Sequence, residues 1–192
     1  MRVTGGQLGG RRVRVPVTGV RPMQDRVRQA LFSILGDRVV GCRFLDLFAG
    51  SGVVGIEAWS RGASSVWWVE RDGRIYSILK ENVVELCWGE SGRERKECRV
   101  VRADAWRFLS RPAETSFDII FMDPPFARFE GGAEWVGEFL GLIGENGFLK
   151  KGGIFVMEEP SWAESWLGDG WRLAWEKRYG QNRLLGMART DE

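Results

Sequence analysis

The 192-residue sequence has no histidine, only three cysteines and no uninterrupted apolar run of 18 residues. Without histidine, the protein lacks the commonest general base and the commonest metal ligand. Cys42, Cys87 and Cys98 are odd in number and lack metal-site spacing, so they predict reduced thiols and no metal centre. Without a long apolar run or an apolar N-terminal leader, we expect no membrane span and a cytoplasmic location.

Positive charge is concentrated in the N-terminal part of the chain, although the net charge is only +2. Residues 1–43 contain nine arginines, no lysine and two acids, a charge of +7 that leaves −5 for the rest. Guanidinium groups bind phosphates and stack on bases, so this basic arm predicts a polyanionic partner, with a solvated tail as the alternative. The expected nucleic-acid contacts are Arg11, Arg12, Arg21, Arg26 and Arg28.

The first 35 residues predict an extended segment followed by a helix. Residues 1–22 are rich in Gly, Arg and Val and favour extended chain or a hairpin. Residues 24–35 carry apolar side chains at helical spacing, which places Arg26 and Arg28 on the more solvated side of the expected helix.

From residue 43 onward, the pattern alternates between short apolar runs and helical stretches. Strands are expected at residues 44–48, 66–69, 100–101, 117–122, 154–157, 171–178 and 183–188, and helices near 53–60, 73–87, 104–110 and 133–143. Such alternation implies a mostly parallel sheet covered on both faces, and the last two runs suggest an antiparallel edge strand. We therefore divide the chain into an N-terminal arm, residues 1–40, and an α/β domain, residues 41–192. Periodicity does not give the strand order.

A glycine turn follows the first expected strand of the α/β domain. Gly50, Gly52 and Gly55 match the pattern G-x-G-x-x-G between an apolar strand and the start of a helix. Glycine allows a sharp turn and close approach of a ligand to the backbone. Dinucleotide-dependent enzymes use the same spacing, and a simple strand–helix turn also fits, so this motif alone does not decide the function.

Three acids close successive strands and are expected to line one edge of the sheet, where open α/β folds bind their ligands. Asp46 is placed to face an ammonium group, and Glu70 to accept the two hydroxyls of a ribose. Asp104 is placed to accept from an adenine amine, with the apolar neighbour Ala105 against the ring. Any of the three acids could instead cap a helix. Together they outline a nucleoside that carries an amino-acid tail.

The sequence Asp123-Pro124-Pro125-Phe126 follows the fourth expected strand. Two prolines fix φ and remove two backbone donors, so the loop is stiff and its acceptors can point at a ligand. The Asp123 carboxylate and the Pro124 carbonyl match the two N–H bonds of a primary amine on a base, and Phe126 can stack on that base. A rigid turn with a buried Phe is the alternative.

These two motifs together resemble the amino-methyltransferases of the Rossmann-like class. The opening segments 2–12 and 21–32 narrow the resemblance to the RsmD-type 16S ribosomal-RNA guanine-N2 methyltransferases of bacteria, and it extends through Tyr179-Gly180. The resemblance implies a seven-stranded sheet with an antiparallel edge strand, preceded by an RNA-contacting hairpin and helix. The chain departs from the family pattern in a longer charged stretch at 88–97 and in its ten tryptophans.

The resemblance also implies an activity and its residues. S-adenosylmethionine is the expected cofactor, and Phe48, Ala49 and Arg71 join the expected cofactor-binding residues. The expected partner is 16S ribosomal RNA or an assembly intermediate of the small subunit, bound by a monomer. The target amine becomes acidic as its bond to the methyl group forms, so no strong base is needed.

Other functions remain open from the sequence. A nicotinamide-dependent oxidoreductase explains the glycine turn but not Asp123-Pro124-Pro125-Phe126. A non-catalytic RNA-binding assembly factor on the same fold is a second alternative. Within the enzyme class, the N6 amine of DNA adenine fits the diproline motif equally well, whereas a protein glutamine fits the basic arm poorly.

Overall fold

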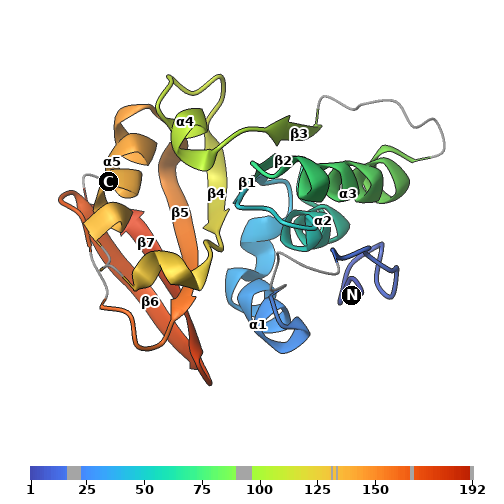
Figure 1. Cartoon of the computed structure of the whole chain (residues 1–192), viewed down its shortest axis with the longest axis horizontal. Coiled ribbons are helices and arrows are strands. Elements are labelled where there is room, and N and C mark those ends of the chain that lie inside the picture. Colours follow the sequence, from blue (N-terminus) through green and yellow to red (C-terminus); the bar gives the residue numbers. More distant parts are fainter. Residues whose placement is uncertain (17–22, 90–96, 131, 133, 165–166, 191–192) are drawn as a thin grey trace. The chain divides into compact units, whose positions relative to one another are not determined.

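The computed structural model describes residues 1–16, 23–89, 97–130, 132, 134–164 and 167–190. The chain divides into two compact units, Met1–Ala105 and Trp106–Glu192, which are described in turn (Figure 1). The expected boundary at residue 40, between the N-terminal arm and the α/β domain, does not coincide with the boundary between these units. The division into an arm and a domain stays a prediction.

The chain forms a seven-stranded sheet with the order β3-β2-β1-β4-β5-β7-β6, which confirms the expected α/β fold class. The strands are β1 Arg43–Leu47, β2 Ser65–Glu70, β3 Cys98–Arg102, β4 Phe117–Met122, β5 Leu149–Pro160, β6 Trp171–Tyr179 and β7 Asn182–Arg189. Every predicted strand is present, and the structure supplies the order that periodicity could not.

In the first unit, β1, β2 and β3 are parallel neighbours. The registers Leu47↔Val69 and Glu70↔Arg102 bring the carboxyl ends of the three strands to one edge. The interior of β1 and β2 is buried, as expected for parallel strands covered on both faces. The helical segments are α1 Asp25–Leu35, the 3-10 turn η1 Gly36–Val39, α2 Val53–Ser60, α3 Gly73–Val83 and the π-helical turn η2 Val84–Trp88.

The N-terminal segment of the first unit is a hairpin, as expected, and it is fixed in place. The backbone N–H of Val13 donates to the carbonyl of Met1, and that of Val3 to the carbonyl of Arg11, at 2.9 Å each. Both valines are buried, so the segment packs on the unit rather than extending from it.

In the second unit, β4 and β5 are parallel, and β7 pairs antiparallel with both β5 and β6. The register Met122↔Met157 brings the ends of β4 and β5 to the same edge, and β5 continues to Pro160. The helical segments are α4 Ala105–Leu109, the 3-10 turn η3 Phe126–Phe129 and α5 Glu134–Glu145. In the part of the chain that the structure describes, no helix has the length and apolarity to cross a membrane.

Candidate functional site

The turn after β1 has an unusual backbone conformation. Phe48, Gly50 and Gly52 have φ values of 57°, 55° and 81°, all in the left-handed region. Only glycine adopts this region without strain, so Phe48 is a strained residue. Strained residues concentrate at ligand sites, where the surrounding fold holds them in place. The turn is closed by a 2.7 Å hydrogen bond from the Gly52 N–H to the Ala49 carbonyl.

Packing, rather than a ligand, accounts for two of the motif glycines. A Cβ atom on Gly52 would lie 2.2 Å from a methyl group of Leu79, and one on Gly55 would lie 2.2 Å from Nε1 of Trp68. Trp68 Nε1 also donates to the Gly52 carbonyl at 3.1 Å. Close packing of the start of α2 against α3 and β2 therefore favours glycine here, in addition to the sharp turn that the sequence suggested.

Glu70, at the end of β2, joins two turns. Its Oε2 accepts from the Gly50 N–H at 3.0 Å, and its Oε1 accepts from the Asp72 N–H at 2.8 Å. Each carboxylate oxygen has two lone pairs, so Glu70 retains acceptor capacity for hydroxyl groups. The structure thus brings together two residues, Gly50 and Glu70, that were expected to bind one nucleoside.

Asp72 is the N-cap residue of α3, and this structural role explains its presence. Its carboxylate accepts from the N–H groups of Arg74 and Ile75 at 2.8 and 3.0 Å. These hydrogen bonds, that of Ile75 first, lower the pKa of Asp72. This acid is therefore structural, whereas Glu70, two residues earlier, is not a helix cap.

Asp46 lies inside the unit. Its side chain is buried, and Oδ2 accepts from the Gly55 N–H at 2.9 Å in the first turn of α2. Burial raises the pKa of Asp46 well above its ordinary value, the charge of Glu70 acts in the same direction, and the bond from Gly55 opposes both. A nearby cation would stabilise the charged form of such an acid.

The ends of β2 and β3 are linked by expected cofactor residues. Arg71 Nη1 and Asp104 Oδ2 form an ion pair at 3.6 Å, with Arg71 well exposed and Asp104 about one-third exposed. The Ala103 N–H donates to the Glu70 carbonyl at 3.1 Å, and Ala105 is buried at the start of α4. The acid expected at the adenine position thus lies beside the segment that carries Glu70.

Asn82 is a site residue that sequence reasoning missed. Its buried side chain donates to the carbonyls of Ser51 and Arg14 at 2.9 Å each and accepts from the Arg14 N–H at 3.0 Å. One amide therefore ties the glycine turn to the N-terminal segment. The signal was an Asn at the apolar spacing of α3, beside Leu79 and Val83.

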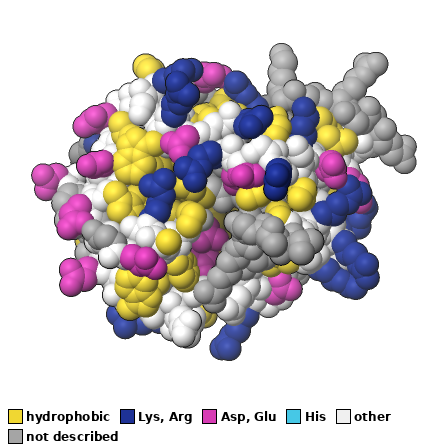
Figure 2. Space-filling view, in the orientation of Figure 1, with side chains coloured by type: hydrophobic (Ala, Val, Ile, Leu, Met, Phe, Trp, Pro, Cys, Tyr) yellow, Lys and Arg dark blue, Asp and Glu magenta, His cyan; other side chains and the backbone are white. Residues whose placement is uncertain are grey.

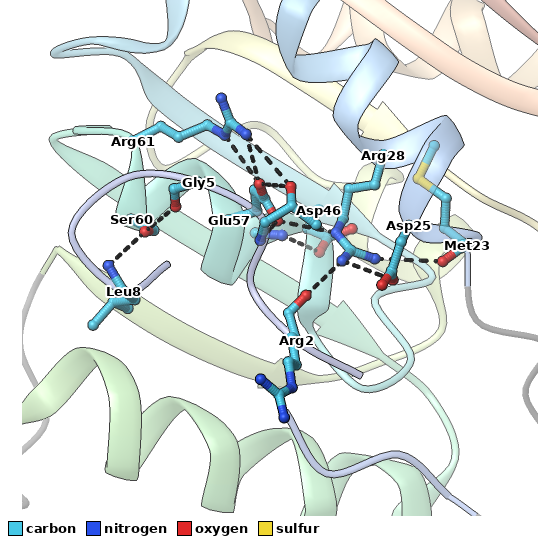
Figure 3. Close-up of polar contacts among 12 residues, drawn as sticks. Arg2, Gly5, Leu8, Met23, Asp25, Arg28, Asp46, Glu57, Ser60 and Arg61 are labelled. Carbon is cyan, nitrogen blue, oxygen red and sulfur yellow. Dashed lines mark hydrogen bonds and ion pairs between the residues drawn. The ribbon is translucent and has the colours of Figure 1, made fainter. Parts of the chain in front are cut away.

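A second buried group fixes the start of the chain to α1 and α2 (Figure 3). Glu57 accepts hydrogen bonds from Thr4, from Arg61 at 2.8 and 3.0 Å, and from Arg28 Nε at 3.0 Å. Burial alone would raise the pKa of Glu57, but the hydrogen bonds from Thr4, Arg61 and Arg28 outweigh it and lower the pKa. Arg28 also donates to the carbonyl of Arg2 at 2.6 Å.

This placement corrects one expected nucleic-acid contact. Arg28 is fully buried, and it also pairs with Asp25 at 3.0 Å. Its guanidinium lies in the interior, where it pairs with the buried Glu57. The expectation that Arg28 faces solvent and contacts nucleic acid was wrong.

The other expected contacts have different placements. Arg11, Arg12 and Arg26 are exposed, whereas Arg21 lies outside the described residues. Arg14, which was not among the expected contacts, is exposed and forms ion pairs with two acids of α3 and η2 at 2.9 and 3.0 Å. Figure 2 shows Lys and Arg side chains gathered on the right of the view, where Figure 1 shows the N-terminal segment and α3.

The diproline loop lies at the end of β4 in the second unit. Asp123 is half-buried, Pro124 is buried, and Phe126 begins η3. Pro125 is extended, with φ −55° and ψ 131°, and its carbonyl accepts from the Arg128 N–H at 2.9 Å. The loop thus passes directly from a buried strand into a helical turn, which fits the stiffness expected of it. The roles of Asp123, Pro124 and Phe126 stay predictions.

An aromatic cluster anchors the helical turn that follows the diproline. The guanidinium carbon of Arg128 lies 5.8 Å from the ring centroid of Trp106 and 5.7 Å from that of Trp135. Phe129 packs edge-on against Trp135, with 5.2 Å between ring centroids. These contacts hold the C-terminal end of η3, the turn that the diproline loop enters.

The strand order, the strained turn after β1 and the acids within β1, at the end of β2 and after β3 define the Rossmann-like class of S-adenosylmethionine-dependent methyltransferase folds. Residues 1–187 match the family described as Conserved hypothetical protein 95, and the chain belongs to that family.

Proteins similar to this chain are named as methyltransferases. The chain is 37% identical to ribosomal RNA small subunit methyltransferase D of Escherichia coli K12, over 94% of this chain and 86% of that protein. It is 38% identical to the putative rRNA methyltransferase YlbH of Bacillus subtilis 168, over 82% of each. The solved structure of the putative methyltransferase yhhF from Escherichia coli superposes with a TM-score of 0.82 at 35% identity, covering 98% of this chain and 97% of that one.

Proposed function

We propose that this protein is an S-adenosylmethionine-dependent methyltransferase that modifies the exocyclic N2 amine of a guanine in 16S ribosomal RNA. The observation that carries the proposal is the stiff loop Asp123-Pro124-Pro125-Phe126 directly after β4, in a chain of this family. The name of the Escherichia coli relative supports small-subunit ribosomal RNA as the substrate. Guanine N2 as the target rests on the resemblance and on the match of two acceptors to a primary amine.

The first unit supplies the residues that hold the cofactor. Asp46 compensates the ammonium group of the methionine part, Glu70 accepts from the ribose hydroxyls, and Asp104 accepts from the adenine amine. Asp46 fits this role because it is a buried acid. Burial raises its pKa, so a cation beside it would stabilise its charged form. When bound, S-adenosylmethionine supplies an electrophilic methyl group on a sulfonium centre.

The second unit supplies the acceptors for the amine. The Asp123 carboxylate and the Pro124 carbonyl each accept one N–H bond, which favours a pyramidal nitrogen with its lone pair available. Phe126 stacks on the base, a contact worth about 1–3 kcal/mol. Orientation of this kind can supply roughly 7–11 kcal/mol of barrier reduction. Acceptors already in place for the developing ammonium add electrostatic stabilisation.

The N-terminal segment supplies contacts to the RNA. Arg11, Arg12 and Arg26 are exposed on elements that Glu57 and Asn82 fix to the first unit. Fixed cations lose less conformational freedom on binding than cations on a mobile tail. The target guanine must leave its stack to reach two acceptors, so a loop or an unstacked base is the expected substrate.

The proposal is tested by incubating the protein with S-adenosylmethionine labelled in the methyl group and with unmodified 16S RNA, naked or in small subunits, and in a parallel reaction with DNA. The RNA is then digested to nucleosides and analysed by mass spectrometry. We expect label in N2-methylguanosine at one position, and no transfer to RNA that already carries the modification. Label in N6-methyladenine of DNA, label in protein, or no transfer to either RNA substrate would contradict the proposal.

A further inference from the structure

Trp162 lies in the connection that follows β5, and its side chain is 59% exposed to solvent. A single exposed apolar residue is ordinary on a protein surface and by itself indicates nothing. What distinguishes Trp162 is that the backbone on both sides of it is held by specific hydrogen bonds.

The residue before Trp162 is bonded to the β6–β7 hairpin. The Ser161 N–H donates to the carbonyl of Gln181 at 2.8 Å, at the turn between the two strands. The residue after it is held twice, because the Ala163 N–H donates to the Pro160 carbonyl at 3.0 Å and the Ala163 carbonyl accepts from Arg183.

The donor to Ala163 belongs to a buried ion pair. Arg183 Nε donates to Glu159 Oε1 at 2.6 Å, and the side chains of Arg183 and Glu159 are 6% and 0% exposed. Burying two charges costs several kcal/mol per ion unless good geometry and further hydrogen bonds offset it. The bond to Ala163 is one such further bond, so the pair is stabilised by holding the segment that carries Trp162.

The diproline loop follows β4 and Trp162 follows β5, so both come after strands that end at the same edge of the sheet, in the second unit. The register Met122↔Met157 places the end of β4 three residues before Pro160, the end of β5. At about 3.3 Å per residue, β5 extends roughly 10 Å beyond the point where Asp123 follows β4. A base held at Asp123 would leave its neighbours in the RNA chain within reach of this edge.

The β6–β7 hairpin, to which Ser161 is bonded, carries exposed cations. Lys177 and Arg178 are exposed near the end of β6, whose register pairs Arg178 with Arg183, and Arg178 also pairs with Glu176 at 2.7 Å. Exposed aromatic rings and cations are the groups that bind single-stranded nucleic acid, in which bases stack on the rings and cations contact the backbone.

We propose that Trp162 is a stacking platform for a base that flanks the methylated guanine, and that the Arg183–Glu159 pair holds this platform in place. The inference rests on the proposed RNA methyltransferase function and adds a third point of substrate contact to the diproline loop and the N-terminal segment.

The test compares Trp162→Ala and Trp162→Phe with the wild-type protein. The dissociation constants for an unmodified 16S RNA fragment and for unmodified small subunits are measured in the presence of S-adenosylhomocysteine, together with the affinity for S-adenosylhomocysteine alone. Loss of one stacked base should weaken RNA binding by about 5- to 150-fold in Trp162→Ala. Trp162→Phe should recover most of the affinity, and binding of S-adenosylhomocysteine should not change. Leu173→Ala, which alters an exposed apolar residue on β6, is the matched control and should bind RNA normally.

Three results would overturn the inference: unchanged RNA affinity in Trp162→Ala, equal losses in the Ala and Phe variants, or a loss seen only with protein-containing subunits. The last result would assign Trp162 to a protein partner. Wild-type protein that transfers no methyl group to RNA would instead overturn the proposed function, so the two failures are distinguishable.

Discussion

Arg28 Nε and Glu57 Oε2 lie 3.0 Å apart, and both side chains are fully buried. Arg28 comes from α1 and Glu57 from α2, and Thr4 of the N-terminal segment donates to the same carboxylate. The pair therefore fixes the arm to the helix that begins at the glycine turn. Arg28, which the sequence suggested as a nucleic-acid contact, therefore has a structural role.

Removing one partner of this pair should destabilise the protein strongly. Glu57→Gln removes the buried counter-charge of the Arg28 guanidinium and leaves only the more exposed Asp25, and loss of a buried partner typically costs about 3–5 kcal/mol. The double variant Arg28→Met/Glu57→Gln removes both charges and should cost less than the sum of the two single variants. Urea unfolding monitored by circular dichroism measures this, and strictly additive losses would show that the two groups do not interact.

The same carboxylate should contribute to the acid sensitivity of the protein. The pKa of Glu57 is lowered in the folded state, so its contribution to stability is complete above the ordinary pKa of glutamate. That contribution disappears as the pH falls through the lowered pKa. Wild-type protein should therefore lose more stability on acidification than Glu57→Gln. Parallel pH profiles for the two proteins would contradict this role.

Gly55→Ala should destabilise the protein although alanine favours helix. A Cβ at this position meets Trp68 Nε1 at 2.2 Å, and overpacking of this kind costs about 1–3 kcal/mol. Gly141 in α5 is the matched control, because its nearest neighbour lies 4.0 Å away, at Glu145. Gly141→Ala should be neutral or stabilising by up to about 1 kcal/mol. Equal melting temperatures for the two variants would show that packing does not require glycine at 55.

Cofactor affinity should depend on pH through Asp46. Its pKa is raised in the free protein, and the charged form is the one that compensates an ammonium group. The affinity for S-adenosylhomocysteine should therefore rise with pH, by up to about tenfold per unit, until Asp46 is ionised. Calorimetric titrations over a pH series measure this dependence. Asp46→Asn should bind weakly and without that slope, and a variant that keeps the wild-type profile would remove Asp46 from the site.

Charge reversal in the arm should reduce the salt dependence of RNA binding. The variant Arg11→Glu/Arg12→Glu loses two phosphate contacts, so the slope of log K against log salt concentration should flatten by about one for each contact. The control variant Arg111→Glu/Arg172→Glu makes the same change in net charge at exposed positions of the second unit. Identical slopes in both variants would show that total charge, rather than the arm, governs binding.

Periodicity predicted the elements well because the strands are short apolar runs and the helices have clear spacing. The helix expected near residues 53–60 is α2, with those bounds, and the helix expected at 24–35 is α1. The start of β5 was missed, since Lys150, Lys151 and two glycines interrupt its apolar run. The strand is irregular at this point, because its register with β4 shifts between Leu149 and Ile154 and Gly152 has a φ of 74°.

The polar interior could not be predicted from local pattern. Arg28 follows a helical spacing that predicts solvent exposure, and its partner Glu57 lies 29 residues away in the sequence. Pairing of this kind is decided by tertiary structure. A clue did exist, because α2 is apolar on nearly all sides, so its one acid had no polar face on which to lie.

The sequence predicted the site residues at the strand ends better than the residues that link the site to the rest of the unit. Glu70 and Asp104 were expected from the rule that parallel strands meet at one edge, and they lie there. Asn82 was not expected, because nothing local indicates that a helix amide will reach both the glycine turn and the N-terminal segment.

Asp123 is the residue on which the proposed methyl transfer depends, because it positions the amine. The measurement that tests this role most directly is a single-turnover assay of Asp123→Ala with saturating S-adenosylmethionine and RNA, with the affinity for S-adenosylhomocysteine determined in parallel. We expect the rate of the chemical step to fall by at least about a hundredfold, from the loss of one preorganised group, while the affinity for S-adenosylhomocysteine stays within about twofold of wild type. Methyl transfer at the wild-type rate by Asp123→Ala would contradict it.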